Sequence, residues 1–436
     1  MKPGFYTIMA AQFFSSLADN ALLIAAIALL RELQEPAWMT PSLKMSFVVS
    51  YVLLAPLVGA FADSMAKGRV MLLTNGIKFV GCMLMLFSTH PLLAYAVVGF
   101  GAAAYSPAKY GILTELLPPQ QLVVANGWIE GTTVGSIILG VLVGGALISP
   151  TVAAALIGFD VPHLDTGVDS PPEAAIAVIM GFYIVAAIFN WFIPDTGVDR
   201  RMVNRNPLFL IREFAHCNSL LWRDRLGQIS LATTTLFWGA GATLQFIVIE
   251  WASTALGFDM SKASMLQGVV AVGIAIGAVV AARYVTLRGS VNVLPIGIAM
   301  GFVVMGMIFV VKLPMVITLM ILIGACAGFF VVPMNALLQH RGHVLMGAGH
   351  SIAVQNFNEN IGILVMVGLY ALLVRLGVSA NAAIVLFGLF VSGTMALVLL
   401  RHRMNQAQYD SLHLIGIEKH GAHGAHGAPA SKPEPS

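Results

Sequence analysis

Charged residues within long apolar runs are the side chains of this sequence that could do chemistry. Asp19 and Lys109 each stand inside a stretch of mostly aliphatic and aromatic residues, and Lys78 stands inside a third. A charged side chain at the centre of a membrane helix costs about 2.5–3.5 kcal/mol on insertion scales, so it normally faces a partner or a polar cavity. A carboxylate and an ammonium facing one chamber bind groups of opposite charge without covalent chemistry. We therefore expect a polar binding site enclosed by apolar helices.

The apolar runs predict the elements that hold these charges. The chain of 436 residues is 58% hydrophobic and 10% charged, which is too apolar for a soluble core. Runs of about 20 apolar residues cross hydrocarbon as helices, because a helix satisfies its own backbone hydrogen bonds. We predict an all-α polytopic membrane protein with twelve spanning helices, at about residues 5–31, 45–65, 70–88, 92–114, 122–149, 174–193, 228–256, 263–285, 291–311, 315–338, 348–374 and 381–401.

The distribution of basic residues predicts the topology. Most of the 23 Lys and Arg residues fall on one side of the membrane if the N-terminus is cytoplasmic, and an even number of spans then places both termini there. The arginine-rich stretch 194–227 divides the spans into two sets of six, and its segment 207–221 mixes apolar and charged residues like a helix lying on a membrane surface. We expect an N-terminal bundle, a basic cytoplasmic linker, a C-terminal bundle and a disordered cytoplasmic tail, at 1–193, 194–227, 228–401 and 402–436.

An internal repeat relates the two predicted bundles. Gly101-Ala-Ala-Ala-Tyr-Ser-Pro-Ala-Lys109 resembles Ala325-Cys-Ala-Gly-Phe-Phe-Val-Val-Pro-Met-Asn335 in the position of its proline and of the polar residue after it. The two strings align at a shift of 226 residues, and the same shift aligns Asp19 with Gln245. Two related bundles that meet at a central site are typical of secondary transporters.

The turn after the second span carries a recognisable motif. It reads Gly59-Ala-Phe-Ala-Asp-Ser-Met-Ala-Lys-Gly-Arg69, which resembles the cytoplasmic loop signature of the major facilitator superfamily. In that superfamily the Gly permits close helix packing, and an acid with basic partners latches the two halves. Asp63, Lys67 and Arg69 are therefore candidate gating residues. No basic residue directly follows Asp63 and the second Gly comes two places late, so an ordinary charged turn remains an alternative.

Further polar residues within spans are candidates for a gate between the bundles. Glu130 shares one helix face with Asn126, and Gln355 shares one with Glu359. The alternative for both pairs is ordinary hydrogen bonding between helices. A glycine run in the fifth span, from Gly140 to Gly145, resembles the antiporter motif of the superfamily but has Val141 in place of its proline. This departure argues against a drug and proton antiporter, and close helix packing is the alternative role of these glycines.

Several longer strings resemble the bacterial lysophospholipid transporters of the major facilitator superfamily. The resemblance is collinear from about residue 8 to residue 400, and the fourth-span string is the most specific of those that carry it. The strings are Ala18-Asp-Asn-Ala-Leu22, Phe61-Ala-Asp-Ser-Met-Ala-Lys-Gly-Arg-Val70, Gly101-Ala-Ala-Ala-Tyr-Ser-Pro-Ala-Lys-Tyr-Gly-Ile-Leu113, Leu236-Phe-Trp-Gly-Ala-Gly241, Gly328-Phe-Phe-Val-Val-Pro333 and Ile352-Ala-Val-Gln-Asn356.

This resemblance implies a two-bundle fold and a function. The family moves lysophosphatidylethanolamine and related lysolipids from the outer to the inner leaflet of the bacterial inner membrane. A cytoplasmic-side acyltransferase/acyl-carrier-protein synthetase then re-acylates them and is the implied functional partner. The implied protein is not an enzyme, and we expect lysophospholipid and membrane lipids as ligands, with no nucleic acid, metal or cofactor.

The resemblance also assigns candidate substrate-binding residues. Asp19 and Lys109 match the cavity residues of the family, and Asn20 adjoins Asp19. The repeat adds Gln245 and Asn335, which it aligns with Asp19 and Lys109. Relatives can carry an Arg at the position of Gln245, and a neutral amide cannot balance a phosphate charge. This departure leaves the headgroup preference open.

Two other function classes stay open at this point. An efflux pump for amphiphilic drugs would have the same spans, although the altered glycine motif argues against it. An intramembrane acyltransferase would need a His followed, after four intervening residues, by an Asp, and this sequence has no such pair.

Overall fold

The computed structural model describes residues 3–35, 39–87, 89–158, 170–197, 206–258 and 260–415. Regular structure within these ranges is helical, and twelve of the helices are long and apolar enough to cross a membrane, which confirms the predicted spans. The α-helices are α1 Pro3–Glu32, α2 Met39–Ser64, α3 Lys67–Leu86, α4 Pro91–Leu116, α5 Leu122–Ile148, α6 Pro150–Ile157, α7 Pro171–Trp191, α8 Pro207–Arg223, α9 Gly227–Leu256, α10 Met260–Tyr284, α11 Leu294–Met305, α12 Leu313–Met346, α13 Ala348–Arg375 and α14 Ala380–Gln408. Short 3-10 helices at Ser290–Val293 and Gly306–Phe309 extend α11 to the length of a span.

Local signals in the sequence set the ends of these helices. Pro91 opens α4, where a proline costs no hydrogen bond because the first N–H groups of a helix have no partner within it. Glu173 in the first turn of α7 accepts a hydrogen bond from the backbone N of Ser170 at 3.0 Å. Gly257 ends α9 with φ of 64°, a left-handed conformation that glycine adopts without steric cost.

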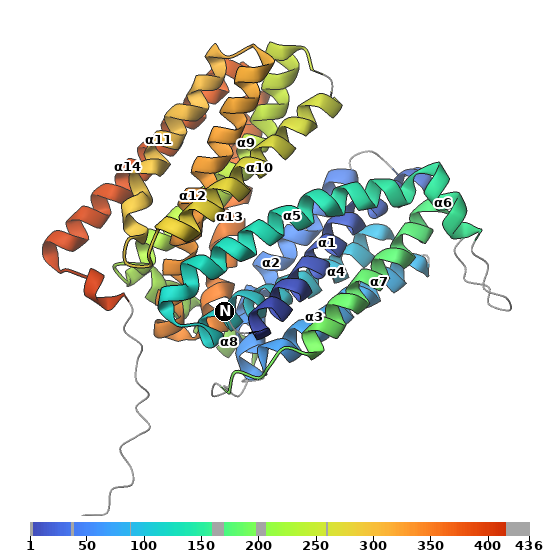
Figure 1. The fold of residues 1–436 in the computed structure, drawn as a ribbon, viewed down its shortest axis with the longest axis horizontal. Coiled ribbons are helices and arrows are strands. Elements are labelled where there is room, and N and C mark those ends of the chain that lie inside the picture. The colour runs from blue at the N-terminus through green and yellow to red at the C-terminus, as the bar shows by residue number, and fades with distance from the viewer. Residues whose placement is uncertain are drawn as a thin grey trace, which may run out of the picture.

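The helices form two bundles that touch at one end. The N-terminal bundle holds α1 to α5 and α7, the C-terminal bundle holds α9 to α14, and α8 connects them. In Figure 1 the bundles lie close together at the end that carries the N-terminus and diverge toward the other end. We call these the closed end and the open end. An apolar core shared by both bundles, with Ile8 and Ile112 on one side and Val331 and Leu337 on the other, fills the closed end.

Glycines allow the closest helix approaches. A Cβ on Gly277 of α10 would overlap the backbone of α12 at Ala325, so these two helices cross backbone to backbone. In α5, a Cβ on Gly140 would come within 2.7 Å of the Leu17 carbonyl oxygen of α1, whereas Gly145 faces open space. Helix packing is therefore the role that the structure gives to the beginning of the glycine run.

The linker contains the helix that the sequence predicts. Helix α8 buries Phe214, Cys217 and Leu221 in a small core that it shares with α2, α9, α12 and α13, and it exposes Leu208 and Ile211. This two-faced pattern is that of an interfacial helix. Because α8 packs on elements of both bundles, it is a structural part of the closed end.

One expectation about the C-terminus is wrong. Helix α14 continues past residue 401 to Gln408, and the chain after it folds back so that Ile415 is 1% exposed. Its apolar side chain joins the core at the closed end, and Asn405 donates a hydrogen bond to the Arg225 carbonyl at 3.2 Å. Residues 402–415 are therefore ordered by packing. The histidine-rich segment 420–426 and most of the acidic insertion, residues 159–169, lie outside the described ranges.

Candidate functional site

A polar cavity lies within the N-terminal bundle. Its volume is about 250 Å³, and its walls include the predicted residues Asp19, Asn20 and Lys109 together with Lys78. These side chains come from α1, α3 and α4, and α2 and α5 complete the walls. Asp19 and Lys109 therefore line one cavity, and their role in binding substrate stays a prediction.

Asp19 is held by an ion pair with Lys78. The Lys78 Nζ lies 2.8 Å from Asp19 Oδ2, and its side chain is 1% exposed against 20% for that of Asp19. Tyr183 donates to Asp19 Oδ1 at 2.7 Å, so both carboxylate oxygens accept a hydrogen bond. Lys78 also donates to Ser15 Oγ at 3.0 Å and lies 4.8 Å from the ring centroid of Tyr105. The structure thus pairs Lys78 with Asp19, whose charge it neutralises.

Lys109 gives the cavity wall a second positive charge. It follows Pro107 by two residues in α4, and its Nζ lies 4.3 Å from the ring centroid of Tyr110. The residues lining the cavity comprise one acid, Asp19, and two bases, Lys78 and Lys109. The formal charge of the wall is therefore positive, which suits a ligand that carries a phosphate.

The remaining predicted substrate residues occupy different positions. Asn20 lines the cavity and donates to the Ser16 carbonyl at 2.8 Å. Gln245 and Asn335 are not among the lining residues of this cavity. Asn335 instead accepts a hydrogen bond from Gln355 at 3.0 Å in the interior of the C-terminal bundle. A role of Gln245 or Asn335 in binding substrate stays a prediction.

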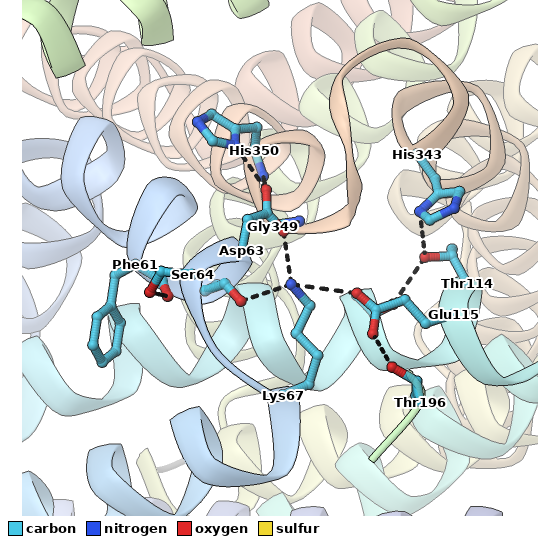
Figure 2. Close-up of polar contacts among 12 residues, drawn as sticks. Phe61, Asp63, Ser64, Lys67, Thr114, Glu115, Thr196, His343, Gly349 and His350 are labelled. Atoms are coloured by element: carbon cyan, nitrogen blue, oxygen red, sulfur yellow. Dashed lines mark hydrogen bonds and ion pairs between the residues drawn. The ribbon is translucent and has the colours of Figure 1, made fainter. Parts of the chain in front are cut away.

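A latch centred on Asp63 joins the two bundles at the closed end (Figure 2). The Asp63 carboxylate accepts hydrogen bonds from the backbone N of Gly349 at 2.7 Å and of His350 at 3.1 Å, and His350 Nδ1 lies 2.7 Å from it. These donors are in the first turn of α13, and the residue before α13, Gly347, has no side chain that could cap it. Asp63 of one bundle thus caps a helix of the other, where a negative charge is favourable.

Lys67 supports the latch from within the N-terminal bundle. Its Nζ lies 2.7 Å from Asp63 Oδ1 and 3.4 Å from Glu115 Oε1, and all three side chains are less than 10% exposed (Figure 2). Lys67 therefore orients the acid without bridging the bundles. The small residue Gly59 lets α2 approach α13 here, since a Cβ on it would lie 3.0 Å from Ala353 Cβ.

Further side-chain hydrogen bonds cross between the bundles. They form a seal beyond the latch, on α4 and α5 of one bundle and α12 and α13 of the other. The pairs are Asn126 with Gln339, joined twice at 2.9 Å, Thr114 with His343 at 3.2 Å, and Asn356 with Ser106 at 2.9 Å.

The other predicted gating residues stay predictions. Arg69 is exposed at the start of α3. Gln355 donates to Glu359 at 2.8 Å within α13. Glu130 belongs to α5, but its side chain lies outside what the structure describes.

Sequence reasoning missed two important contributors. His350 and Tyr183 contact Asp63 and Asp19, but neither belongs to a motif with its partner. A Gly-Ala-Gly string before His350 signals a tight helix start, and a tyrosine in an apolar span needs a partner for its hydroxyl. These signals indicate a hydrogen bond in each case without naming the partner.

The comparisons with known proteins agree with this architecture. The family model of the Major Facilitator Superfamily matches residues 8–367. The chain belongs to the Major Facilitator Superfamily. Its twelve spans in two bundles are the fold of that superfamily, whose members with this architecture are membrane transporters.

Relatives within the superfamily carry a more specific name. The lysophospholipid transporter LplT of Yersinia enterocolitica serotype O:8 / biotype 1B is 43% identical over 383 residues, covering 88% of this chain and 90% of that protein. The lysophospholipid transporter LplT of Yersinia pestis strain Pestoides F is 44% identical over 371 residues, covering 85% and 86%. The resemblance to bacterial lysophospholipid transporters is therefore confirmed.

Solved structures share the fold at low identity. The human organic anion transporter MFSD10 (TETRAN) superposes with a TM-score of 0.69 at 18% identity, covering 92% of this chain and 100% of that one. A bacterial homologue of the iron transporter ferroportin, in an outward-facing state, superposes with a TM-score of 0.70 at 12% identity, covering 93% and 100%. These two likenesses bear on the fold of this superfamily member and not on its substrate.

Proposed function

We propose that this transporter moves lysophosphatidylethanolamine or a related lysolipid from the outer to the inner leaflet of the bacterial inner membrane. The observation that carries the proposal is the charged cavity of Asp19, Lys78 and Lys109 inside an apolar bundle. A lysolipid has one acyl chain for apolar walls and a phosphate for a basic group. Relatives at 43% and 44% identity named lysophospholipid transporters support the same substrate class.

Different charged residues of the cavity bind different groups of the lipid headgroup. Lys109 binds the phosphate, which every lysophospholipid carries. Asp19 receives the amine of an ethanolamine headgroup, but Lys78 already occupies one of its oxygens. The amine of the lipid therefore competes with the Lys78 ammonium for Asp19. Asp19 consequently binds this amine less strongly than an unpaired carboxylate would. This competition lets one cavity accept zwitterionic and anionic headgroups.

The transport cycle alternates between two arrangements of the bundles. With both termini in the cytoplasm, the closed end faces the cytoplasm and the open end faces the outer leaflet. The lysolipid enters from that leaflet between the diverging bundles, and its headgroup occupies the cavity. Rocking of the bundles then separates Asp63 from Gly349 and opens the cytoplasmic side. The released lysolipid is the substrate for re-acylation by an acyltransferase/acyl-carrier-protein synthetase.

Transport by purified protein in liposomes tests the proposal. Labelled lysophosphatidylethanolamine and lysophosphatidylglycerol are added outside, and their appearance in the inner leaflet is measured for wild type, Lys109→Met and Asp19→Asn. We expect Lys109→Met to slow both lipids, because both carry a phosphate. Asp19→Asn slows the ethanolamine lipid more than the glycerol lipid. Equal transport of both lipids by wild type and Lys109→Met, at matched amounts of folded protein, contradicts the proposal.

A further inference from the structure

A groove outside the transport cavity runs along the C-terminal bundle. Its apolar part, of about 310 Å³, is lined by α9, α13 and α14 with side chains such as Ile247, Leu373 and Phe387. At one end it meets a polar hollow of about 400 Å³ that contains Glu250 and Asn381. Tyr370 and Ala383 line both hollows, so the two adjoin, and we treat them together as one groove.

The groove lies on the lipid-facing side of the bundle. Figure 1 shows α14 at the edge of the C-terminal bundle turned away from the N-terminal bundle. Helix α13 begins at the latch, so its other end and the start of α14 are at the open end. The polar hollow is there, and the apolar part points toward the middle of the membrane.

The length of the groove matches one leaflet. Along α9 it extends from Thr243 in the apolar part to Ala255 in the polar part. At about 1.5 Å per residue, this stretch of helix is roughly 18 Å long. Half of a hydrocarbon core of about 30 Å is roughly 15 Å. A lipid of the leaflet at the open end therefore has the right depth and the right order of polarity to lie in the groove.

The volume and charge of the groove lining indicate which kind of lipid fits it. The apolar part has room for about ten groups the size of a water molecule, which is one acyl chain and not two. Glu250 is the one charged residue in the lining, all of which lies in the described part of the chain, and its neighbours Thr254, Ser379 and Asn381 are neutral. A carboxylate at the headgroup position attracts an amine and repels a phosphate that carries no amine.

We propose that this groove binds a phosphatidylethanolamine-type membrane lipid, with one acyl chain between α9, α13 and α14 and its amine at Glu250. The second chain stays in the bilayer. Asn381 is placed to donate to the lipid phosphate. The site is separate from the transport cavity and does not depend on which substrate the protein moves.

Native mass spectrometry of the full-length protein tests this site. The detergent-purified protein is titrated with a phosphatidylethanolamine and a phosphatidylglycerol of identical chains, and separately with a single-chain lysophosphatidylethanolamine. We expect Glu250→Gln to lower the preference for the ethanolamine lipid about fivefold, the effect of one partly exposed ion pair. Glu32→Gln is the matched control, because Glu32 is an exposed acid at the open end of the other bundle.

A second variant tests the apolar part. Leu369 lines it and is 51% exposed, so Leu369→Trp fills the groove without overpacking the core. We expect weaker binding of both diacyl lipids. An unchanged preference in Glu250→Gln, or an equal loss in Glu32→Gln, overturns the amine assignment. Undiminished binding in Leu369→Trp overturns the groove, and a loss confined to single-chain lysophosphatidylethanolamine overturns the assignment to a diacyl lipid.

Discussion

Replacing Asp63 with Asn is expected to shift the conformational balance of the transporter. The three hydrogen bonds that Asp63 accepts from Gly349 and His350 cross between the bundles, whereas the bond that it accepts from Lys67 stays within one bundle. Only the crossing bonds differ between a closed and an open latch. They therefore determine the effect on the balance of states.

The size of the shift follows from these contacts. Hydrogen bonds to a charged group contribute about 1.5–3 kcal/mol each before the acid regains water on opening. An Asn keeps one neutral acceptor, so we estimate a net loss of about 2–3 kcal/mol. This loss changes the ratio of closed to open latch by roughly 30-fold to 150-fold.

Distances between spin labels at the open end measure this ratio. Leu33 in the turn after α1 and Val311 in the turn before α12 are 54% and 66% exposed and belong to different bundles, so labels there report their separation. The native cysteines, at positions 82, 217 and 326, are first replaced by Ala. We expect Asp63→Asn to enrich the population with the shorter distance between the two labels, in which the latch is open and the bundles have approached each other at the opposite end. Arg69→Gln, a charge removal on the same turn, is the control and leaves the distribution unchanged.

Two results would refute this reasoning. If Asp63→Asn leaves the distance distribution as in wild type, the latch does not set the resting state. If Arg69→Gln produces the same shift, then the loss of charge on the turn, and not the bonds to α13, is responsible.

Three further predictions concern the cavity and the packing. Lys78→Met leaves Asp19 without its ion pair and should lower the free energy of unfolding by about 3 kcal/mol, and adding Asp19→Asn should restore much of that loss. Thermal unfolding in detergent measures the stability of the single and double variants. If the losses of the two single variants simply add in the double variant, Lys78 and Asp19 are not coupled. Gln245→Arg should raise transport of lysophosphatidylglycerol relative to lysophosphatidylethanolamine, because a guanidinium binds phosphate in a bidentate manner; an unchanged ratio in competition uptake means that the side chain does not reach the headgroup. Gly277→Val should lower the unfolding temperature strongly, because a Cβ at this position would overlap the backbone carbonyl of Ala325 in α12. Gly268 faces open space, so Gly268→Ala should leave the unfolding temperature unchanged. Equal unfolding temperatures for the two variants would contradict the close crossing of α10 and α12.

Hydropathy predicted the spans because every membrane helix carries its own signal. Apolar runs of sufficient length are local, and Pro91 and Gly257 mark helix ends within a few residues of where they act. The order at 402–415 was missed because it depends on Ile415 reaching a core that is built by distant parts of the chain.

Charged residues within the spans predicted where the cavity lies, but they did not predict which acid pairs with which base. A charge in hydrocarbon needs a polar surrounding, and the resemblance to the superfamily implied that the helices of Asp19 and Lys109 line one chamber. Which cation bonds Asp19 depends on how α1 and α3 are rotated, and the chain carries no local signal for that rotation. From the sequence Lys78 could neutralise Asp19 or Asp63, and only the three-dimensional arrangement identifies Asp19 as its partner. The same limit explains why the motif revealed Asp63 but not the N–H groups it caps on α13.

The latch is present on only one of the two bundles. In the C-terminal bundle, the turn between α10 and α11 corresponds to the turn that carries Asp63, and it reads Thr286-Leu-Arg-Gly-Ser290 without an acid. No second carboxylate on that turn can compensate for a change at Asp63. The start of α13 therefore depends on one side chain of the other bundle for its cap, and a substitution of Asp63 alone removes that cap.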